Sequence, residues 1–495
     1  MHLTSDPVNV LWFKRDLRLN DHEPLALTVR QEQPVILFYA FEPDLIASGV
    51  YDLRHWRFVW ESIVELNRQL KRHDNILHVL WADPKEVLAA ISERFQIKGL
   101  YSHQETGLKI TFDRDKSVAA WCRKHGVPWH ESKSNGVIRA LRSREHWLEC
   151  WAEFINMPLV DVDTSRLKSI DCPDLFNAFK LPQSFKDQLE ARNILFQPGG
   201  SSKGQAYLAS FLSDRHRNYR SFMSKPEASR RSCSRLSPYL AWGCLSVRQV
   251  YQEARVKLAE QPGGSSVAEA FLSRLRWQSH FIQKFESECE IEFRDFNAGF
   301  CDLRMEWDED LYQAWANGRT GYPLVDACMR CLHATGWINF RMRAMLVSFL
   351  THHLWLDWRA GARHLGRLFL DFEPGIHYPQ FHMQAGTTGV HTFRIYNPER
   401  QAVLHDPQAK FIKQWIPELN NLPAALALAP YRISYLEEVF YQFRLGIDYP
   451  RPIVDIAQTY QSAREKLWKH QQNNPEVKIE ALRILRIHTT PNRTV

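Results

Sequence analysis

The feature that most constrains the fold is an alternation of short apolar runs with helical patterns near the start of the chain. The apolar runs are NVLWF (9–13), VILFYAF (35–41), ILHVLW (76–81) and GLYSH (99–103). Between them, residues 55–73 and 84–95 carry apolar side chains at helical spacing. Strands that alternate with helices in this way are typical of a parallel, doubly wound sheet. No G-x-G-x-x-G follows the first run, so this region need not bind a dinucleotide.

The rest of the chain differs from this region in its periodicity. Residues 131–202 are poorly periodic and end in QPGGSSKG, which is typical of a connecting segment. From residue 203 onward the pattern is almost wholly helical. Because 495 residues are too many for one core, we predict three parts. They are a Rossmann-like α/β domain (1–130), an interdomain connector (131–202) and a large all-α domain (203–495).

Composition excludes several classes of protein. The chain has no stretch of 18 uncharged apolar residues and no basic or apolar leader, so we expect no membrane segment and no secretory signal. Nine cysteines are an odd number in a long chain, which favours reduced thiols in the cytoplasm. Cys328 and Cys331 form the only C-x2-C pair and lie on an apolar-periodic helix, so we expect core packing and no metal site.

The segment SCSRLSPYLAWGCLS (232–246) has the features of an anion-binding helix start. Pro238 suits the first helical turn, where its missing N–H costs nothing. Free backbone N–H groups there, with the hydroxyls of Ser234 and Ser237 and the cation of Arg235, suit a phosphate or pyrophosphate. A plain serine N-cap would look similar, so both interpretations stay open at this point.

The motifs downstream resemble those of one family. They are GRTGYPLVDACMRCLHATGWINFRMRAM (318–345), LFLDFEPGIHYPQFHMQAGTTGVHTFRIYNP (368–398) and FIKQWIPEL (411–419), with LWFKRDLRLNDHEPL (11–25) before them and YPRPIVD (449–455) after them. The chain resembles the photolyase/cryptochrome superfamily of FAD-binding blue-light proteins nearly end to end. The resemblance implies that the all-α domain wraps a U-shaped FAD, and that the anion at residues 232–246 is the FAD phosphate.

The resemblance also implies the residues that contact FAD. Tyr219 and the segment Cys233 to Ser237 match phosphate-side contacts, Arg343 and Asp371 match a buried ion pair beside the flavin ring, and Glu373 matches an acid at the ring's polar edge. The full set of expected FAD contacts is Tyr219, Cys233, Ser234, Arg235, Leu236, Ser237, Phe271, Gln278, Phe340, Arg343, Asp371, Glu373 and His377. Cys233 stands where a threonine or serine is common in the family.

Several departures from the family fall in the expected active site. His377 occupies the position that faces flavin N5, and histidine there could donate to N5 and titrate near neutrality. Arg274 replaces the glutamate that contacts damaged bases, and Met383 replaces the tryptophan that stacks on the lesion. Trp277 and Arg341 match a wall of the lesion pocket and a substrate-side cation. These five residues are the candidates for catalysis, and Arg274 in place of an acid puts the usual repair of cyclobutane dimers in question.

The electron-transfer chain departs as well. Relatives reduce FAD in the light through three tryptophans, and Trp358 and Trp307 match the middle and outer members. The inner member is Phe381, which is far harder to oxidise. Tyr378, Trp337 or Trp355 could substitute, or photoreduction could be slow. Core packing is the alternative role for each of these three aromatics.

The resemblance leaves three functional hypotheses. The first is a light-driven DNA lyase that binds UV-damaged pyrimidines, with Arg341, Arg274 and Arg394 as candidates for contacts to DNA phosphates. The second is a cryptochrome-type photoreceptor without repair activity, whose signalling partner the sequence does not name. The third is a light-independent flavoprotein. Trp277 and Arg341 favour the first hypothesis, to which we lean, whereas four departures from the family favour the second: Arg274, Phe340, Met383 and Phe381. We expect the protein to be a cytoplasmic monomer.

The sequence also bears on two further cofactors. A second, antenna chromophore of unknown identity could sit in the α/β domain, because HQETG (103–107) lies where relatives shape that site. An iron–sulfur cluster is not expected, because no cysteine follows Cys331.

Overall fold

The computed structural model describes residues 6–261 and 264–488. Its N-terminal region contains, among these residues, a five-stranded parallel sheet of order β3-β2-β1-β4-β5. The strands are β1 (Pro7–Phe13), β2 (Val35–Phe41), β3 (Leu77–Trp81), β4 (Gln96–His103) and β5 (Trp129–Ser132). The predicted α/β fold class is therefore confirmed. β5 has no counterpart among the predicted runs, because its sequence WHES is polar and it forms an incompletely buried edge.

Alternate side chains of each strand enter two different cores. In β1, Leu11 and Phe13 pack with α1 (Glu23–Arg30) and α3 (Leu53–Leu70). Val10 and Trp12 face the other way and pack with α4 (Pro84–Arg94) and α5 (Lys109–His125). The core on the α3 side continues into the helical body, so this face of the sheet is covered by both regions.

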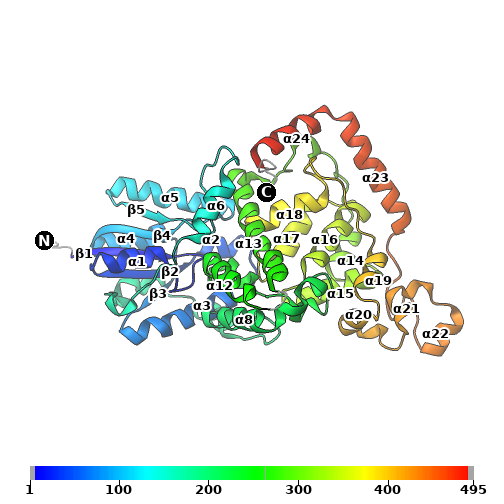
Figure 1. Ribbon diagram of the computed structural model, residues 1–495, viewed down its shortest axis with the longest axis horizontal. Coiled ribbons are helices and arrows are strands. Elements are labelled where there is room, and N and C mark those ends of the chain that lie inside the picture. The colour runs from blue at the N-terminus through cyan, green and yellow to red at the C-terminus, as the bar shows by residue number, and fades with distance from the viewer. Residues whose placement is uncertain (1–5, 262–263, 489–495) are drawn as a thin grey trace.

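The remaining α-helices lie between β2 and α3, in the connector and in the helical body (Figure 1). Their bounds are α2 (Pro43–Ala47), α6 (Trp147–Asn156), α7 (Gln183–Glu190), α8 (Ser201–Ser213), α9 (Tyr219–Phe222), α10 (Ser229–Ser232), α11 (Ser237–Ala241), α12 (Val247–Ala259), α13 (Gly264–Ser287), α14 (Glu309–Ala316), α15 (Pro323–Thr335), α16 (Phe340–Ser348), α17 (Trp358–Leu368), α18 (Pro374–Ala385), α19 (Pro398–His405), α20 (Lys410–Trp415), α21 (Ala424–Leu428), α22 (Tyr435–Tyr441), α23 (Ile456–Asn473) and α24 (Pro475–His488).

Helices α13 and α18 form the centre of the helical body and pack directly on each other, with α16 against α18. Gly375, at the start of α18, permits this contact, because a Cβ there would lie 2.8 Å from the Ile282 Cα of α13. Cys328 and Cys331 lie on α15 with 0% of their surface exposed, as the apolar pattern predicts. Among the described residues, no helix is long and apolar enough to cross a membrane.

Candidate functional site

A cavity of about 350 Å³ lies between four helices of the helical body. α11, α13, α16 and α18 all contribute to its lining, together with the segment that follows α17. This volume falls in the range of small-molecule and cofactor sites. Of the expected FAD contacts, the following line the cavity: Tyr219, Ser234, Leu236, Ser237, Phe271, Gln278, Phe340, Arg343, Asp371, Glu373 and His377.

One wall of the cavity carries a buried ion pair with a spare acceptor. The Arg343 guanidinium donates to Asp371 Oδ2 over 2.8 Å and to the Ile338 carbonyl over 2.9 Å. Burial opposes ionisation of Asp371, but Arg343 and the Ser237 hydroxyl outweigh it and hold the pKa of Asp371 below its ordinary value. The buried Asp371 Oδ1 has no hydrogen-bond partner. A buried carboxylate oxygen of this kind suits an N–H donor on a bound ligand.

Glu373, on the same wall, is held by the N-terminal region. Arg15, from the loop after β1, donates from Nη2 to Glu373 Oε2 over 2.8 Å and from Nε to the Ala241 carbonyl over 2.9 Å. Its guanidinium also lies 5.2 Å from the ring centre of Trp242. The Gly375 N–H donates to Glu373 Oε1 at the start of α18. Burial raises the pKa of Glu373, and Arg15 opposes that rise.

A second wall is made of hydroxyl groups and a cation. Tyr219, Ser234 and Arg274 all line the cavity. Burial raises the pKa of Tyr219 to about 12, and the positive charge of Arg274 partly offsets this effect. The wall therefore offers donors and a positive charge, as an anion requires.

His377 differs from the expectation drawn from the sequence. Its Nε2 lies 2.8 Å from the Ala362 carbonyl, which can only accept, so Nε2 carries the proton. Burial lowers the pKa of His377 to about 4, so the ring is neutral near pH 7 and does not titrate there. Nδ1 is therefore an acceptor. His377 can accept a hydrogen bond from a ligand in the cavity but cannot donate one from Nδ1, which corrects the predicted donor role.

Arg235 and Cys233 do not line the cavity. Arg235 adopts a left-handed backbone (φ 61°), and its guanidinium donates to Gln197 Oε1 over 2.7 Å. It also lies 4.1 Å from the ring centre of Trp337. The cation expected to hold the phosphate is therefore engaged elsewhere, although Ser234 and Ser237 on either side of it do reach the cavity.

Aromatic and basic side chains also lie on the helices that line the cavity. Phe340, which lines it, is 55% exposed, and Trp277, beside the lining residue Gln278 on α13, is 47% exposed. Arg341 lies over the ring of Tyr396 at 5.8 Å. Met383 of α18 is only partly buried and does not line the cavity. Within residues 6–261 and 264–488, no salt bridge joins Arg341 or Arg394 to a carboxylate.

Aromatic rings connect the cavity to the interior of the helical body. Phe381 and His377 line the cavity, and the His377 and Tyr378 ring centres are 5.4 Å apart. Tyr378 lies 6.5 Å from Trp358, whose Nε1 donates to Asp295 Oδ1 over 2.9 Å. Trp307 is 47% exposed. The expected substitute Tyr378 thus lies between the cavity and Trp358.

Of the described residues, one group of three could offer ligands to a metal: Asp16, His22 and His103. The His103 Nδ1 donates to Asp16 Oδ2 over 2.7 Å. His22 Nδ1 accepts from the Leu25 N–H over 3.1 Å, so in the neutral ring Nε2 carries the proton. In this tautomer His22 Nε2, which lies 3.1 Å from Asp16 Oδ2, has no lone pair to offer a metal ion.

The segment HQETG (103–107), where the resemblance suggests an antenna site, is tied to its neighbours. Glu105 accepts from Arg114 Nη2 over 2.6 Å, and the Thr106 hydroxyl donates to Glu286 Oε2 of α13 over 3.0 Å. Two cavities border the segment, each of about 30 Å³. Each volume is large enough for an ordered water molecule.

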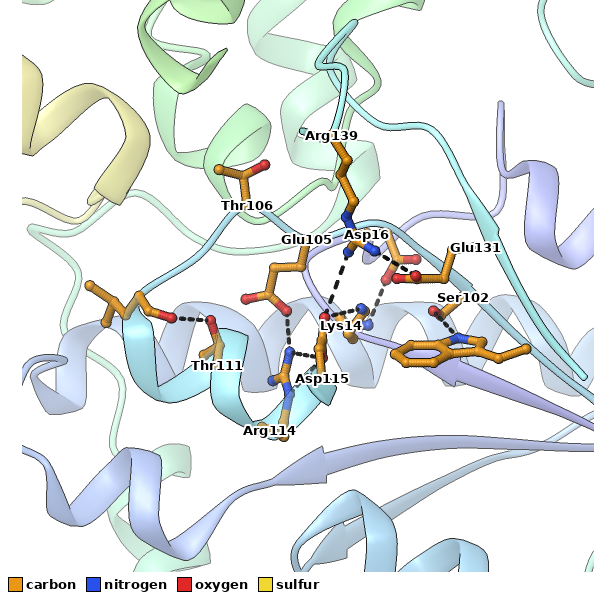
Figure 2. A network of polar contacts seen from close by, with 12 residues as sticks. Lys14, Asp16, Ser102, Glu105, Thr106, Thr111, Arg114, Asp115, Glu131 and Arg139 are labelled. Carbon is orange, nitrogen blue, oxygen red and sulfur yellow. Dashed lines mark hydrogen bonds and ion pairs between the residues drawn. The ribbon is translucent and has the colours of Figure 1, made fainter. Parts of the chain in front are cut away.

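Figure 2 shows the charged network beside this segment, at the carboxyl ends of β1 and β4. Lys14 and Arg114 each pair with Asp115, over 3.2 and 2.8 Å. Both cations also lie 4.8 Å from the ring centre of Trp12. These charges compensate one another, and the network occupies the carboxyl ends of β1 and β4.

The fold and the cavity together indicate a protein that binds a nucleotide cofactor. A doubly wound domain is joined to a helical body whose cavity has a wall suited to a hydrogen-bonding ring and a wall suited to an anion. That arrangement fits an elongated nucleotide cofactor such as a flavin dinucleotide.

Comparison with known proteins identifies the family. The model for the FAD binding domain of DNA photolyase matches residues 271–469, and the model for DNA photolyase matches residues 9–144. The chain is 31% identical to a deoxyribodipyrimidine photo-lyase of Streptomyces griseus, over 91% of this chain and 97% of that protein. It is 29% identical to a cryptochrome DASH of Synechocystis, over 93% and 97% of the two chains. The crystal structure of a Synechocystis cryptochrome superposes with a TM-score of 0.82 at 25% identity, covering 93% of this chain and 99% of that one.

The chain therefore belongs to the DNA photolyase and cryptochrome family, and its helical body contains the FAD-binding domain. Sequence analysis missed Arg15 as a residue that supports this site. The signal was present, because Arg15 lies within the motif LWFKRDLRLNDHEPL, which follows the first strand. It also missed Trp337 as a lining residue, having considered it only for electron transfer.

Proposed function

We propose that this protein is a light-driven DNA lyase that uses FAD to repair UV-damaged pyrimidines. The observation that supports this function best is the set of aromatic and basic side chains on and beside the lining of the cavity. Phe340 lines the cavity and Trp277 is next to the lining residue Gln278, and both aromatic side chains are partly exposed. Arg341 and Arg394 have no carboxylate partner among the described residues. Aromatic faces stack on bases, and free arginines contact backbone phosphates.

In this proposal, different residues around the cavity bind the DNA and the cofactor. Arg341 and Arg394 would hold the phosphates of the strand, while Trp277 and Phe340 would stack against a damaged base that has left the duplex. FAD, when bound, supplies light absorption and one-electron transfer. Asp371 Oδ1 would accept a hydrogen bond from the ring of the cofactor, and neutral His377 would accept another through Nδ1. The apolar lining would exclude water.

The electron path from the protein would run through Tyr378 and Trp358. Both are buried and lie in sequence from the cavity toward the interior. Trp307, exposed at the surface, would be the outer donor. The nine cysteines are free thiols, which supports a role in a reducing compartment such as the cytoplasm, and we propose that the protein acts there as a monomer.

The proposal can be tested directly. The protein with chemically reduced FAD would be mixed with oligonucleotides that carry a cyclobutane dimer or a (6-4) photoproduct, illuminated with blue light, and analysed by chromatography for restored thymines. We expect restoration of one lesion above a dark control, and its loss in Trp277→Ala. Tyr460→Ala, a partly exposed aromatic on α23, is the matched control. If neither lesion is restored while the flavin responds to light, the repair function is refuted and the photoreceptor hypothesis takes its place.

A further inference from the structure

Two tryptophans differ from the others in the partners of their indole N–H groups. Trp358 Nε1 donates to Asp295 Oδ1 over 2.9 Å, and Trp307 Nε1 donates to Glu309 Oε2 over 2.9 Å. Among the other tryptophans of the described chain, one donates to a carbonyl, one donates to a serine hydroxyl, and the buried ones without a partner are Trp147, Trp151, Trp242 and Trp415. Within residues 6–261 and 264–488, carboxylate partners are therefore confined to the two tryptophans of the proposed electron path.

The contact between Trp358 and Asp295 is closed to solvent. The two residues are 2% and 4% exposed, so bulk water cannot take a proton from this indole as it can from the exposed Trp307. His382 packs on Trp358 with the ring centres 4.2 Å apart, but its two nitrogens are engaged by a backbone carbonyl and a threonine hydroxyl. Asp295 is therefore the described group placed to accept the proton of the Trp358 indole.

The charges around Trp358 favour loss of that proton once the indole is oxidised. The Arg359 guanidinium lies 5.0 Å from the centre of the Trp358 ring and donates to Asp295 Oδ2 over 3.1 Å. A positive charge on the indole would face this cation in a buried place, where charges interact strongly. Burial raises the pKa of Asp295, although Arg359 and the indole N–H oppose the rise, so this carboxylate binds a proton more readily than an exposed aspartate does.

We propose that Asp295 accepts the indole proton when Trp358 is oxidised, and thereby slows the return of the electron to Trp358. In this step Trp358 loses one electron toward the light-excited flavin of bound FAD, its Nε1–H bond breaks, and the proton forms an O–H bond with Asp295 Oδ1. A neutral indolyl radical and a neutral carboxylic acid result. When Trp307 gives an electron to Trp358, the proton returns to Nε1. The inference rests on the proposed electron path and is independent of whether the protein repairs DNA.

The test follows the Trp358 radical in the full-length protein with bound FAD after a flash of blue light. Protonated and deprotonated indole radicals have different visible spectra, so transient absorption identifies the form that is present. Trp307→Phe is the background for the measurement, because it removes the outer donor and leaves the radical on Trp358. In this background we expect the deprotonated form, a decay that is slower in D2O, and a light-induced infrared band of a protonated carboxyl group.

Adding Asp295→Asn keeps a hydrogen-bond acceptor of the same shape that does not take up the proton. We expect the radical to stay protonated, the carboxyl band to disappear, and electron return to become about tenfold faster or more. Asp357→Asn is the matched control, because Asp357 bonds to the same Arg359 over 3.0 Å but not to the indole. Asp357 also caps α17, a role that asparagine fills equally well.

The outcomes separate the role of Asp295 from the electron path. A protonated radical in Trp307→Phe alone would overturn the role of Asp295, and this measurement needs no change at Asp295 that could disturb folding. A deprotonated radical in Asp295→Asn, or electron return as slow as in Asp357→Asn, would overturn it as well. In these cases the electron path stands. If no tryptophan radical forms in the wild-type protein, the path is refuted and this inference with it.

Discussion

Replacing Arg15 by methionine tests how the N-terminal region supports the FAD site. Both side chains of the Arg15–Glu373 pair are nearly buried, 11% and 8% exposed. Removing one partner of a buried pair leaves an uncompensated charge, which costs about 3–5 kcal/mol of folding free energy. Glu373 can escape this cost by taking up a proton. Its pKa is already raised by burial, and the loss of Arg15 would raise it further.

The consequence is a destabilisation that depends on pH. In the unfolded chain Glu373 has its ordinary pKa of 4.5, whereas in the folded variant the pKa is higher. Between these two pKa values the folded state holds a proton that the unfolded state lacks, so the stability of the variant falls as pH rises. We therefore expect Arg15→Met to cost about 3–5 kcal/mol at pH 8, the range for a broken buried pair, and clearly less at pH 5. The loss at pH 5 reflects the hydrogen bond to Ala241 and the contact with Trp242.

Urea titration followed by tryptophan fluorescence at the two pH values measures both quantities. Arg166→Met is the matched control, because Arg166 pairs with Glu32 at the surface, where the side chains are 58% and 65% exposed. Such pairs contribute little, so the control should change little at either pH. A loss for Arg15→Met that is equal at pH 5 and pH 8, or no larger than that of the control, would refute the assignment of a buried, charged Glu373.

Three further predictions follow from the site and the core. His377→Asn should shift acid unfolding, followed by fluorescence, to lower pH. Because the pKa of His377 falls from 6.5 to about 4 on folding, the wild-type protein loses roughly 3 kcal/mol between these values as pH falls. Trp358→Phe should nearly abolish light-driven reduction of bound FAD, followed by absorbance, and Tyr378→Phe should slow it severalfold; wild-type rates would exclude both from the path. A chelator should leave the melting temperature unchanged, whereas Cys328→Ala with Cys331→Ala should lower it, because both thiols fill the core.

The α/β fold was predictable because its signal is local. Each buried strand is a continuous apolar run, as in β2, where all seven residues are buried. β5 carries no such signal, because an edge strand of four residues needs few apolar side chains. The division at residues 130 and 202 stays a prediction.

The candidate site was predictable where a residue's role follows from its motif, and less so where it depends on contacts with residues distant in the sequence. Arg343 and Asp371 meet as their motif implies. The direction of Arg235 could not be foreseen, because it depends on a left-handed backbone angle and on Gln197, which is far from it in the sequence. The state of His377 depends on the Ala362 carbonyl of another helix and on burial, neither of which a single sequence shows.

The structure also gives the N-terminal region a physical role at the site. Doubly wound sheets commonly bind ligands where the strand order reverses, beyond the carboxyl ends of the strands. Here that edge is filled by Trp12 and the paired charges of Lys14, Arg114 and Asp115. Arg15, one residue after Lys14, instead extends from this edge to the wall of the FAD cavity, where it contacts Glu373. The same loop thus closes the usual ligand site of the sheet and fixes the charge of Glu373, so changes in the α/β region should be detectable at the flavin.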